Sequence, residues 1–333
     1  MSSDSHPSRS PAYEGGLTDI QGIRVGHAVD PRRPTGVTVV LPEREVMAGV
    51  DIRGSAPGTR ETALLDPVRS VKRIHAVVLS GGSAFGLDAA SGVVRYLEER
   101  GVGYQTPVAR VPIVPSAILF DLALGDASVR PGPELGRRAC RNAAAGPVPE
   151  GNAGAGAGAT VGKILGHEHA MKGGVGSAAI RTGPLVVAAL VAVNAVGDVI
   201  DPETGRILAG ARGAGGRGFA DTMAVLKERG LPKRRSAEDE NTTLGVVATN
   251  AEFDKASLTK IAQMAHDGLA RTILPVHMPS DGDTVFALST ESVQGPELGL
   301  VGALAAQVTA RAVVRAVLHA EPLPGYPCAS DYL

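Results

Sequence analysis

The sequence predicts an α+β fold in which buried strands pack against helices. The segment 185–194 (LVVAALVAVN) is apolar without interruption, which is typical of a strand that is covered on both faces. The segment 254–273 instead places its leucine and isoleucine residues on one helical side. The segment 296–320 has the length and composition of a long C-terminal helix. Both kinds of element are therefore expected to build the core.

The first third of the chain is expected to alternate short strands with turns. Residues 1–14 are polar and carry no apolar run, so we expect a disordered tail rather than a signal peptide. Segments 22–28 and 35–42 have strand composition. The segment 76–100 has the pattern of a strand, a glycine-rich loop and a helix.

The character of the chain changes twice in its last third. From about 205 to 240, glycine and charged residues dominate, ending in LPKRRSAEDE, and we expect a flexible linker. At Asn241 the pattern changes to TTLGVVAT, whose β-branched residues predict a strand. The linker therefore leads into a strand that begins with a threonine.

Composition excludes several classes of function. A formal net charge of −1 gives no electrostatic basis for binding nucleic acid or an anionic membrane. No uninterrupted apolar run of about 18 residues occurs, so we expect no membrane span. Cys140 and Cys328 lack metal-ligand spacing and are too few for a disulfide framework, which favours a cytoplasmic protein.

The Asn241–Thr242 junction is the first candidate for chemistry. A hydroxyl is a weak nucleophile at neutral pH, and a threonine at a free N-terminus carries its own base in the α-amine. An internal threonine reaches that state only when the preceding peptide bond is cut, which its hydroxyl can do by attacking the carbonyl before it. The dipeptide alone also suits an ordinary turn at the start of a strand.

Seven ordered stretches between about Gly15 and Leu318 resemble the DmpA-like family of N-terminal-nucleophile hydrolases. This family includes L-aminopeptidase/D-amidase-esterases, β-peptidyl aminopeptidases and 6-aminohexanoate (nylon) oligomer hydrolases. The stretches are GLTDIQGIRVGH, DIRGSAPGTRET, LSGGSAFGLDAASGV, GNAGAGAGATVGK, VNAVGDVID, NTTLGVVATNA and DGDTVFALST.

The resemblance implies one domain over residues 15–333 with a four-layer αββα sandwich, of the type shared with ornithine acetyltransferases. It implies self-cleavage between Asn241 and Thr242 into an α chain (1–241) and a β chain (242–333). It also implies a homo-oligomer, a tetramer of αβ pairs.

Carried onto this chain, the resemblance places the nucleophile at Thr242, and Thr243 is a rival start one residue later. Asn194 matches the amide of the oxyanion hole, although an asparagine also suits a strand end before a turn. Lys163 matches a lysine beside the nucleophile in the nylon-hydrolase branch; the alternative is a surface lysine after a glycine loop.

Asp281 and Asp283 match a carboxylate pair in the same branch, where they would hold the threonine amine and Lys163. The alternative is a tight Asp-Gly turn before a strand. Gly82, Ser83 and Phe120 are candidate substrate contacts. Gly82 and Ser83 would contribute backbone N–H groups at the start of a helix. Phe120 stands where many relatives have a tyrosine, whose hydroxyl donates to the oxyanion or binds the substrate amine.

Three other motifs fail on closer inspection. A nucleophile elbow around Ser83 lacks the second glycine at Phe85. The run before Lys163 lacks the P-loop residues, and its partial match to a dinucleotide fingerprint is expected by chance in so dense a Gly/Ala segment. His167 and His169 have no further ligands at metal spacing, so we expect no metal and no cofactor.

We therefore predict an autoprocessed N-terminal threonine hydrolase that acts on peptides or peptide-like amides. The substrate classes that fit are peptides with small N-terminal residues, β-peptides, D-residue amides and 6-aminohexanoate oligomers. Two alternatives stay open: a non-catalytic protein of the same fold that binds a small metabolite, and an acyltransferase related to ornithine acetyltransferase. Against the latter, SAEDENTT precedes the strand where those enzymes carry a lysine-glycine signature.

Overall fold

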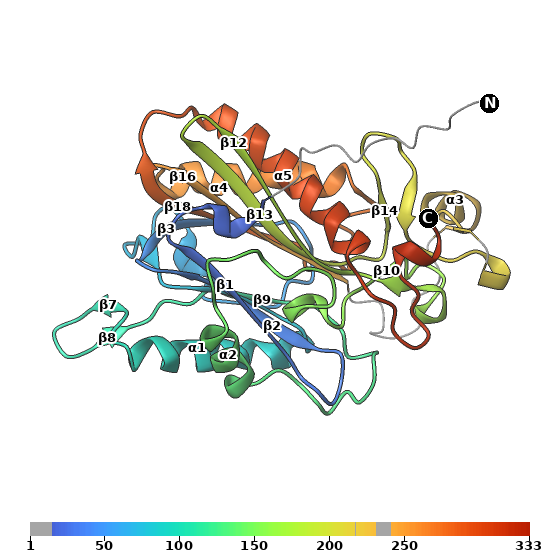
Figure 1. The fold of residues 1–333 in the computed structure, drawn as a ribbon, viewed down its shortest axis with the longest axis horizontal. Helices are drawn as coiled ribbons and strands as arrows, with labels where there is room; N and C mark the ends of the chain where they lie inside the picture. Colours follow the sequence, from blue (N-terminus) through green and yellow to red (C-terminus); the bar gives the residue numbers. More distant parts are fainter. Residues whose placement is uncertain (1–14, 217, 231–240) are drawn as a thin grey trace, which may run out of the picture.

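A computed structural model describes residues 15–216, 218–230 and 241–333. Most of its strands belong to two sheets (Figure 1). The five-stranded sheet has the order β1 (Ile23–Val29), β2 (Gly36–Pro42), β6 (Val77–Ser80), β9 (Ser116–Ile118), β4 (Thr59–Arg60). The six-stranded sheet has the order β12 (Gly174–Thr182), β13 (Leu185–Asn194), β16 (Thr242–Ala251), β18 (Thr284–Val293), β3 (Val46–Ile52), β5 (Arg73–Ile74). The expected tail, residues 1–14, lies outside the described residues.

The two sheets face each other, and helices cover both outer faces. Helices α1 (Ala89–Glu98) and α2 (Pro133–Arg141) lie on the five-stranded sheet, below it in Figure 1. Helices α4 (Lys255–Ala270) and α5 (Leu298–Leu318) lie on the six-stranded sheet, above it in the same view. The four-layer αββα sandwich implied by the family resemblance is therefore confirmed.

The alternation of side chains along β13 shows how one apolar run supplies two cores. Val187, Ala189 and Val191 join the core beneath α4 and α5. Their neighbours Ala188 and Leu190 join the core between the two sheets. Because successive residues of a strand point to opposite faces, a strand buried on both sides needs apolar residues at every position. This explains the uninterrupted sequence LVVAALVAVN.

Glycines allow α5 to pack closely against β12. A Cβ on Gly176 would lie 2.1 Å from the carbonyl oxygen of Ala312, and one on Gly174 would lie 2.3 Å from that of Ala316. Any larger residue at either position would push helix and strand apart. The same packing explains the apolar composition of α5. It is long and apolar enough to cross a membrane, but 56% of the relevant window is buried inside the protein, as in the core helix of a globular fold.

Short elements complete the fold at one end of the sandwich. Two small sheets form there: β10 with β11, and β15 with β14 and β17. A separate hairpin elsewhere on the molecule pairs β7 with β8. Their bounds are β7 (Tyr104–Gln105), β8 (Arg110–Val111), β10 (Thr160–Val161), β11 (Met171–Lys172), β14 (Asp198–Ile200), β15 (Ile207–Ala209) and β17 (Ile273–Leu274).

Part of the segment expected to be a flexible linker is regular structure. Strand β15 and helix α3 (Thr222–Arg229) both lie between 205 and 240. The buried carboxylate of Asp198 anchors them, since it accepts hydrogen bonds from the backbone and hydroxyl of Thr222 (2.6 and 2.7 Å) and from the backbone of Ala211 (2.8 Å). The composition of the segment did not reveal this distant anchor. The rest of the expected linker, residues 231–240, lies outside the described part of the chain.

Candidate active site

The candidate nucleophile Thr242 is the first residue of β16, in the middle of the six-stranded sheet. Strand β13 runs antiparallel to β16 and ends at Asn194, which is the direct partner of Thr242. Strand β18 runs parallel to β16 and starts just after Asp281 and Asp283. These three strand ends lie side by side at the same end of the sheet. The topology therefore brings together residues separated by up to 89 positions in the sequence.

The peptide bond before Thr242 is surrounded by hydrogen bonds. The Thr242 side chain, 4% exposed, donates from Oγ1 to the carbonyl oxygen of Asn241 at 2.5 Å. The backbone N–H of Gly282 donates to the same carbonyl oxygen at 2.9 Å. The hydroxyl therefore lies against the carbonyl group that it would attack in self-cleavage.

The Asn194 side chain is fully buried and its orientation is determined by its partners. Its Oδ1 accepts from the backbone N–H of Thr160 (3.0 Å) and from Nζ of Lys163 (2.9 Å). Its Nδ2 donates to the carbonyl oxygen of Phe120 at 3.0 Å. An amide nitrogen carries two N–H groups, so these contacts leave one of them for another acceptor.

Lys163 is buried beside Asn194 rather than exposed on the surface. It is 7% exposed, and its ammonium also lies 3.3 Å from the carbonyl oxygen of Asn194. The positive charge of Lys163 also acts on Asp281, where it partly opposes the rise in pKa described below. The expected grouping of Thr242, Asn194, Lys163 and the two aspartates is therefore present in the geometry.

Asp281 is held in an environment that disfavours its charge. Burial and the neighbouring carboxylate of Asp283 raise its pKa from 3.8 to about 7, despite opposing contributions from Met278, Lys163 and His277. Its Oδ2 accepts from the backbone N–H of Met278 at 2.8 Å. Its Oδ1 is buried and has no hydrogen-bond partner within the described ranges. Such a carboxyl group gains or loses its proton near neutral pH.

Asp283 fixes the backbone of the strand that carries the candidate nucleophile. Its Oδ1 accepts from the N–H of Thr243 at 2.6 Å. Its Oδ2 accepts from Nδ1 of His277 at 2.8 Å and from the His277 backbone at 3.2 Å. The carboxylate thus links the residue after Thr242 to an imidazole six positions before itself.

His277 was not predicted from the sequence. It has a positive φ of 57° and packs edge-on against His266, with ring centroids 4.8 Å apart. His266 donates from Nε2 to the carbonyl oxygen of Asp51 (3.1 Å), and burial lowers its pKa to about 4, so it is neutral at pH 7. Gly282 was missed as well. The available signals were a histidine shortly before two aspartates and a glycine between them, and neither signal specifies a contact.

The structure does not support the prediction that Gly82 and Ser83 bind substrate through their backbone N–H groups. The N–H of Ser83 donates to the carbonyl oxygen of Leu119 at 3.0 Å, and the N–H of Gly82 donates to Oδ1 of Asp121 at 2.9 Å. Both groups are occupied within the protein, so they do not form the anion site expected at a helix start. Phe120 does lie beside the site, but through its carbonyl oxygen and Asn194.

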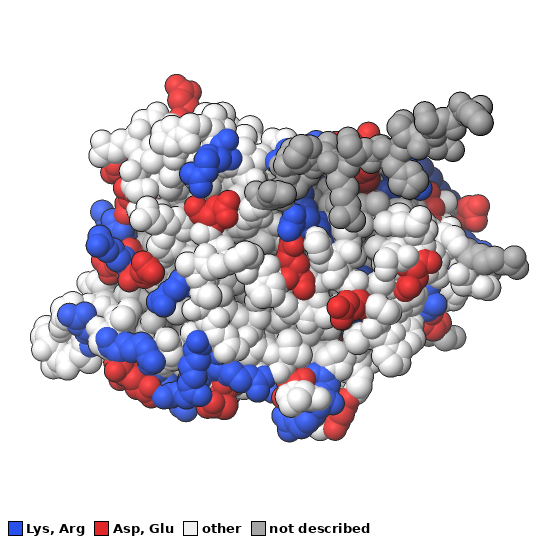
Figure 2. Space-filling view, in the orientation of Figure 1, with Lys and Arg blue, Asp and Glu red and all other residues white. Residues whose placement is uncertain are grey.

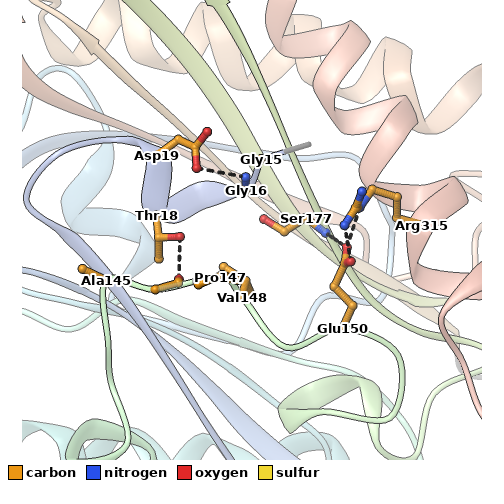
Figure 3. Close-up of a pocket in the computed structure, with 11 residues that line it drawn as sticks. Gly15, Gly16, Thr18, Asp19, Ala145, Pro147, Val148, Glu150, Ser177 and Arg315 are labelled. Atoms are coloured by element: carbon orange, nitrogen blue, oxygen red, sulfur yellow. Dashed lines mark hydrogen bonds and ion pairs between the residues drawn. The ribbon is translucent and has the colours of Figure 1, made fainter. Parts of the chain in front are cut away.

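The candidate catalytic residues are buried in the continuous chain. A hollow of about 270 Å³ lies elsewhere, between η2 (Leu17–Asp19), β12 and α5 (Figure 3). Two of its charged groups are paired with each other, because Glu150 accepts from Nε of Arg315 at 2.8 Å; Glu150 also accepts from the backbone N–H of Ser177 at 2.7 Å. Over α1 and α2, basic and acidic side chains alternate, so that face presents no field of one sign (Figure 2).

His167 and His169 belong to a short helical turn, η6 (His167–His169). Among the described residues, no group of three or more His, Cys, Asp or Glu side chains is arranged to hold a metal ion.

The comparisons with known proteins define the class of this chain, a hydrolase that acts on amide bonds. The model of peptidase family S58 matches residues 15–328, and the chain belongs to this family. An uncharacterized aminopeptidase of Mycobacterium tuberculosis is 45% identical over 95% of this chain and 97% of its own length. A 6-aminohexanoate-oligomer endohydrolase of Kocuria is 31% identical over 87% of this chain and 79% of its own length.

Solved structures agree on the fold. The L-aminopeptidase D-Ala-esterase/amidase of Ochrobactrum anthropi has a TM-score of 0.68 at 23% identity, covering 94% of this chain and 89% of that one. A β-aminopeptidase of Burkholderia has the same TM-score at 22% identity, covering 92% and 86%. The first of these is described as a variant of the Ntn-hydrolase fold.

Proposed function

We propose that this hydrolase is an aminopeptidase or amidase whose nucleophile is Thr242, released by self-cleavage of the Asn241–Thr242 bond. The observation that supports this most is the position of the Thr242 hydroxyl, 2.5 Å from the carbonyl oxygen of Asn241 at the edge where Asn194 and the two aspartates meet. The burial of Thr242 in the continuous chain also suits a precursor whose site opens on cleavage.

In the processed enzyme, Oγ1 of Thr242 attacks the substrate carbonyl, and the α-amine of the same residue takes the hydroxyl proton. The remaining N–H of Asn194 donates to the tetrahedral oxyanion. The amine then passes the proton to the leaving group, and water hydrolyses the ester. All of these groups belong to the chain itself.

Lys163, Asp281 and Asp283 position this centre. A buried ammonium near the α-amine lowers the pKa of that amine, because two like charges disfavour each other. The carboxylates oppose this effect and hold both nitrogen groups through charge-assisted hydrogen bonds. The same acidic side chains suit a substrate that carries a free amino group.

The substrate class that we propose is a peptide or peptide-like amide, with 6-aminohexanoate oligomers included because of the Kocuria relative. Hydrolysis of p-nitroanilides of L-Ala, D-Ala and β-Ala, compared with a 6-aminohexanoate oligomer, ranks these classes. Phe120 carries no hydroxyl to donate to the oxyanion, so substrate preferences of tyrosine-containing relatives do not transfer directly.

We also propose a cytoplasmic homo-oligomer, a tetramer of αβ pairs. Two buried free cysteines, Cys140 and Cys328, suit a reducing compartment. Light scattering of the purified protein measures the assembly size directly.

The deciding experiment is a denaturing gel with mass spectrometry of the purified protein. We expect two fragments, the smaller beginning at Thr242, and a single uncleaved, inactive chain for Thr242→Ala. Thr243→Ala is the matched control: it removes a hydroxyl one residue later and should still be cleaved. A wild-type protein that stays intact would contradict the proposal and favour a non-catalytic binder of the same fold. Transfer of the acyl group to an added amine instead of water would favour an acyltransferase.

A further inference from the structure

The loop between the two aspartates brings a backbone donor to the bond that is to be cleaved. Asn241 and Asp281 form a parallel bridge, and the N–H of Gly282 donates to the carbonyl oxygen of Asn241 at 2.9 Å. This oxygen becomes negatively charged when Thr242 attacks. A donor that already points at it stabilises that charge without reorganisation.

The loop is held rigidly from its other side. The carbonyl oxygen of Asp281 accepts from the N–H of Ala56 at 2.9 Å, and that of Asp283 accepts from the N–H of Arg53 at 3.0 Å. These two hydrogen bonds flank Gly282 and fix the direction of its peptide group. The donor is therefore part of the fold before any reaction begins.

Position 282 also has no room for a side chain. A Cβ there would lie 2.8 Å from Oγ1 of Thr242 and 2.9 Å from the carbonyl oxygen of Ala56. Contacts this short force a neighbour to move, and the hydroxyl is the more mobile of the two. The glycine thus lets the N–H approach the carbonyl and leaves the hydroxyl in place.

We propose that the backbone N–H of Gly282 is the oxyanion donor for self-cleavage, whereas Asn194 serves the hydrolysis of substrates. This inference rests on the proposed function. Oγ1 of Thr242 bonds to the carbonyl carbon of Asn241, and its proton is transferred to the Thr242 nitrogen as the C–N bond breaks. The resulting ester is hydrolysed by water, which leaves a carboxylate on Asn241 and a free hydroxyl and α-amine on Thr242.

The direct test removes the N–H alone. Glycolic acid in place of Gly282, introduced by nonsense suppression in cell-free translation, converts the amide into an ester. We expect self-cleavage to slow by about 10²-fold, the usual effect of losing one oxyanion donor. Once processed, the same protein should hydrolyse substrate with little change in kcat. Asn194→Ala should show the opposite pattern, with a larger loss in kcat than in the cleavage rate.

A matched control accounts for the weakened carbonyl that an ester creates at Asp281. Lactic acid in place of Ala56 removes the N–H that donates to this carbonyl oxygen but leaves the Gly282 donor intact, so cleavage should stay near the wild-type rate. Equal slowing in both ester variants would overturn the assignment to Gly282.

A second variant tests the steric part with ordinary mutagenesis. Gly282→Ala should slow cleavage by at least 10-fold, because the new methyl group displaces the hydroxyl. Gly299→Ala is the control, since a Cβ there meets nothing within 4 Å. Circular dichroism of both variants in the Thr242→Ala background checks that they fold.

The two proposals fail in distinguishable ways. If the wild-type chain is never cleaved, the proposed function is wrong. If wild type is cleaved, Thr242→Ala is not, and the Gly282 ester is cleaved at the wild-type rate, the threonine mechanism stands and the role of Gly282 is overturned.

Discussion

Two buried aspartates, Asp121 and Asp281, differ sharply in how their charges are accommodated. Asp121 forms an ion pair with Arg33 and accepts from Oγ1 of Thr35 (2.6 Å) and the N–H of Gly82 (2.9 Å), so both of its oxygens are occupied. The side chain of Asp281 accepts a hydrogen bond from the backbone N–H of Met278, and its Oδ1 has no hydrogen-bond partner among the described residues. Both are at most 3% exposed.

The difference separates a carboxylate whose partners are all within the fold from one that we propose for the catalytic centre. Burial raises the pKa of both groups, but the Arg33 guanidinium opposes this effect at Asp121. At Asp281, the neighbouring Asp283 adds to it instead. A buried charge with complete hydrogen bonding stabilises one arrangement of the chain, whereas one with an unused oxygen is ready to exchange a proton.

The largest expected effect on stability comes from Asp121→Asn. The change leaves the Arg33 charge buried without its partner, and losing one member of such a pair costs about 3–5 kcal/mol. Urea unfolding of the Thr242→Ala chain, with and without Asp121→Asn, measures the loss. Asp267→Asn, on the exposed surface of α4, is the control and should leave the unfolding midpoint unchanged. An unchanged midpoint for Asp121→Asn would show that the ion pair is not what stabilises this region.

Asp281→Asn should instead lower turnover strongly and change stability little. We expect the turnover of processed enzyme to fall by about 10²-fold, the order of effect of losing a group that moves or holds a proton. The free energy of unfolding should change by about 1 kcal/mol or less, because the Met278 N–H can still donate to the amide oxygen. Steady-state kinetics and urea unfolding on the same preparations give both numbers. Loss of stability without loss of turnover would place Asp281 with Asp121 as a structural residue.

The sequence predicted those elements whose secondary structure depends on local pattern and residue type. The uninterrupted run of β13 and the β-branched start of β16 predict two strands, and both are present. The resemblance to known hydrolases added the layer order and the grouping of Thr242, Asn194, Lys163 and the aspartates, which no spacing in the sequence reveals. Asn194 and Thr242 are 48 positions apart and meet only because their strands are neighbours.

The parts that could not be predicted depend on backbone groups and on distant partners. The N–H of Gly282 is invisible in a sequence, since every residue except proline has one. The backbone N–H groups of Gly82 and Ser83 are not available to a substrate in this structure, because they donate to Asp121 and Leu119. These acceptors lie more than 30 residues away in the sequence. Helix α3 was missed for a similar reason, as its anchor Asp198 lies outside the charged segment.

The smallest expected effect is the pH dependence of stability that Asp281 contributes. The pKa of Asp281 in the folded chain, about 7, is above its ordinary value of 3.8. Between these values this carboxyl group binds more protons in the folded state than in the unfolded state, so its contribution to the free energy of unfolding falls as the pH rises from about 4 to about 7. In the Thr242→Ala background, adding Asp281→Asn should remove this contribution and make the slope of the free energy of unfolding against pH more positive. His277→Gln should move the upper end of the window to higher pH, because the charge of His277 lowers the pKa of Asp281. An identical slope with and without Asp281→Asn would show that this carboxyl group does not titrate in that range.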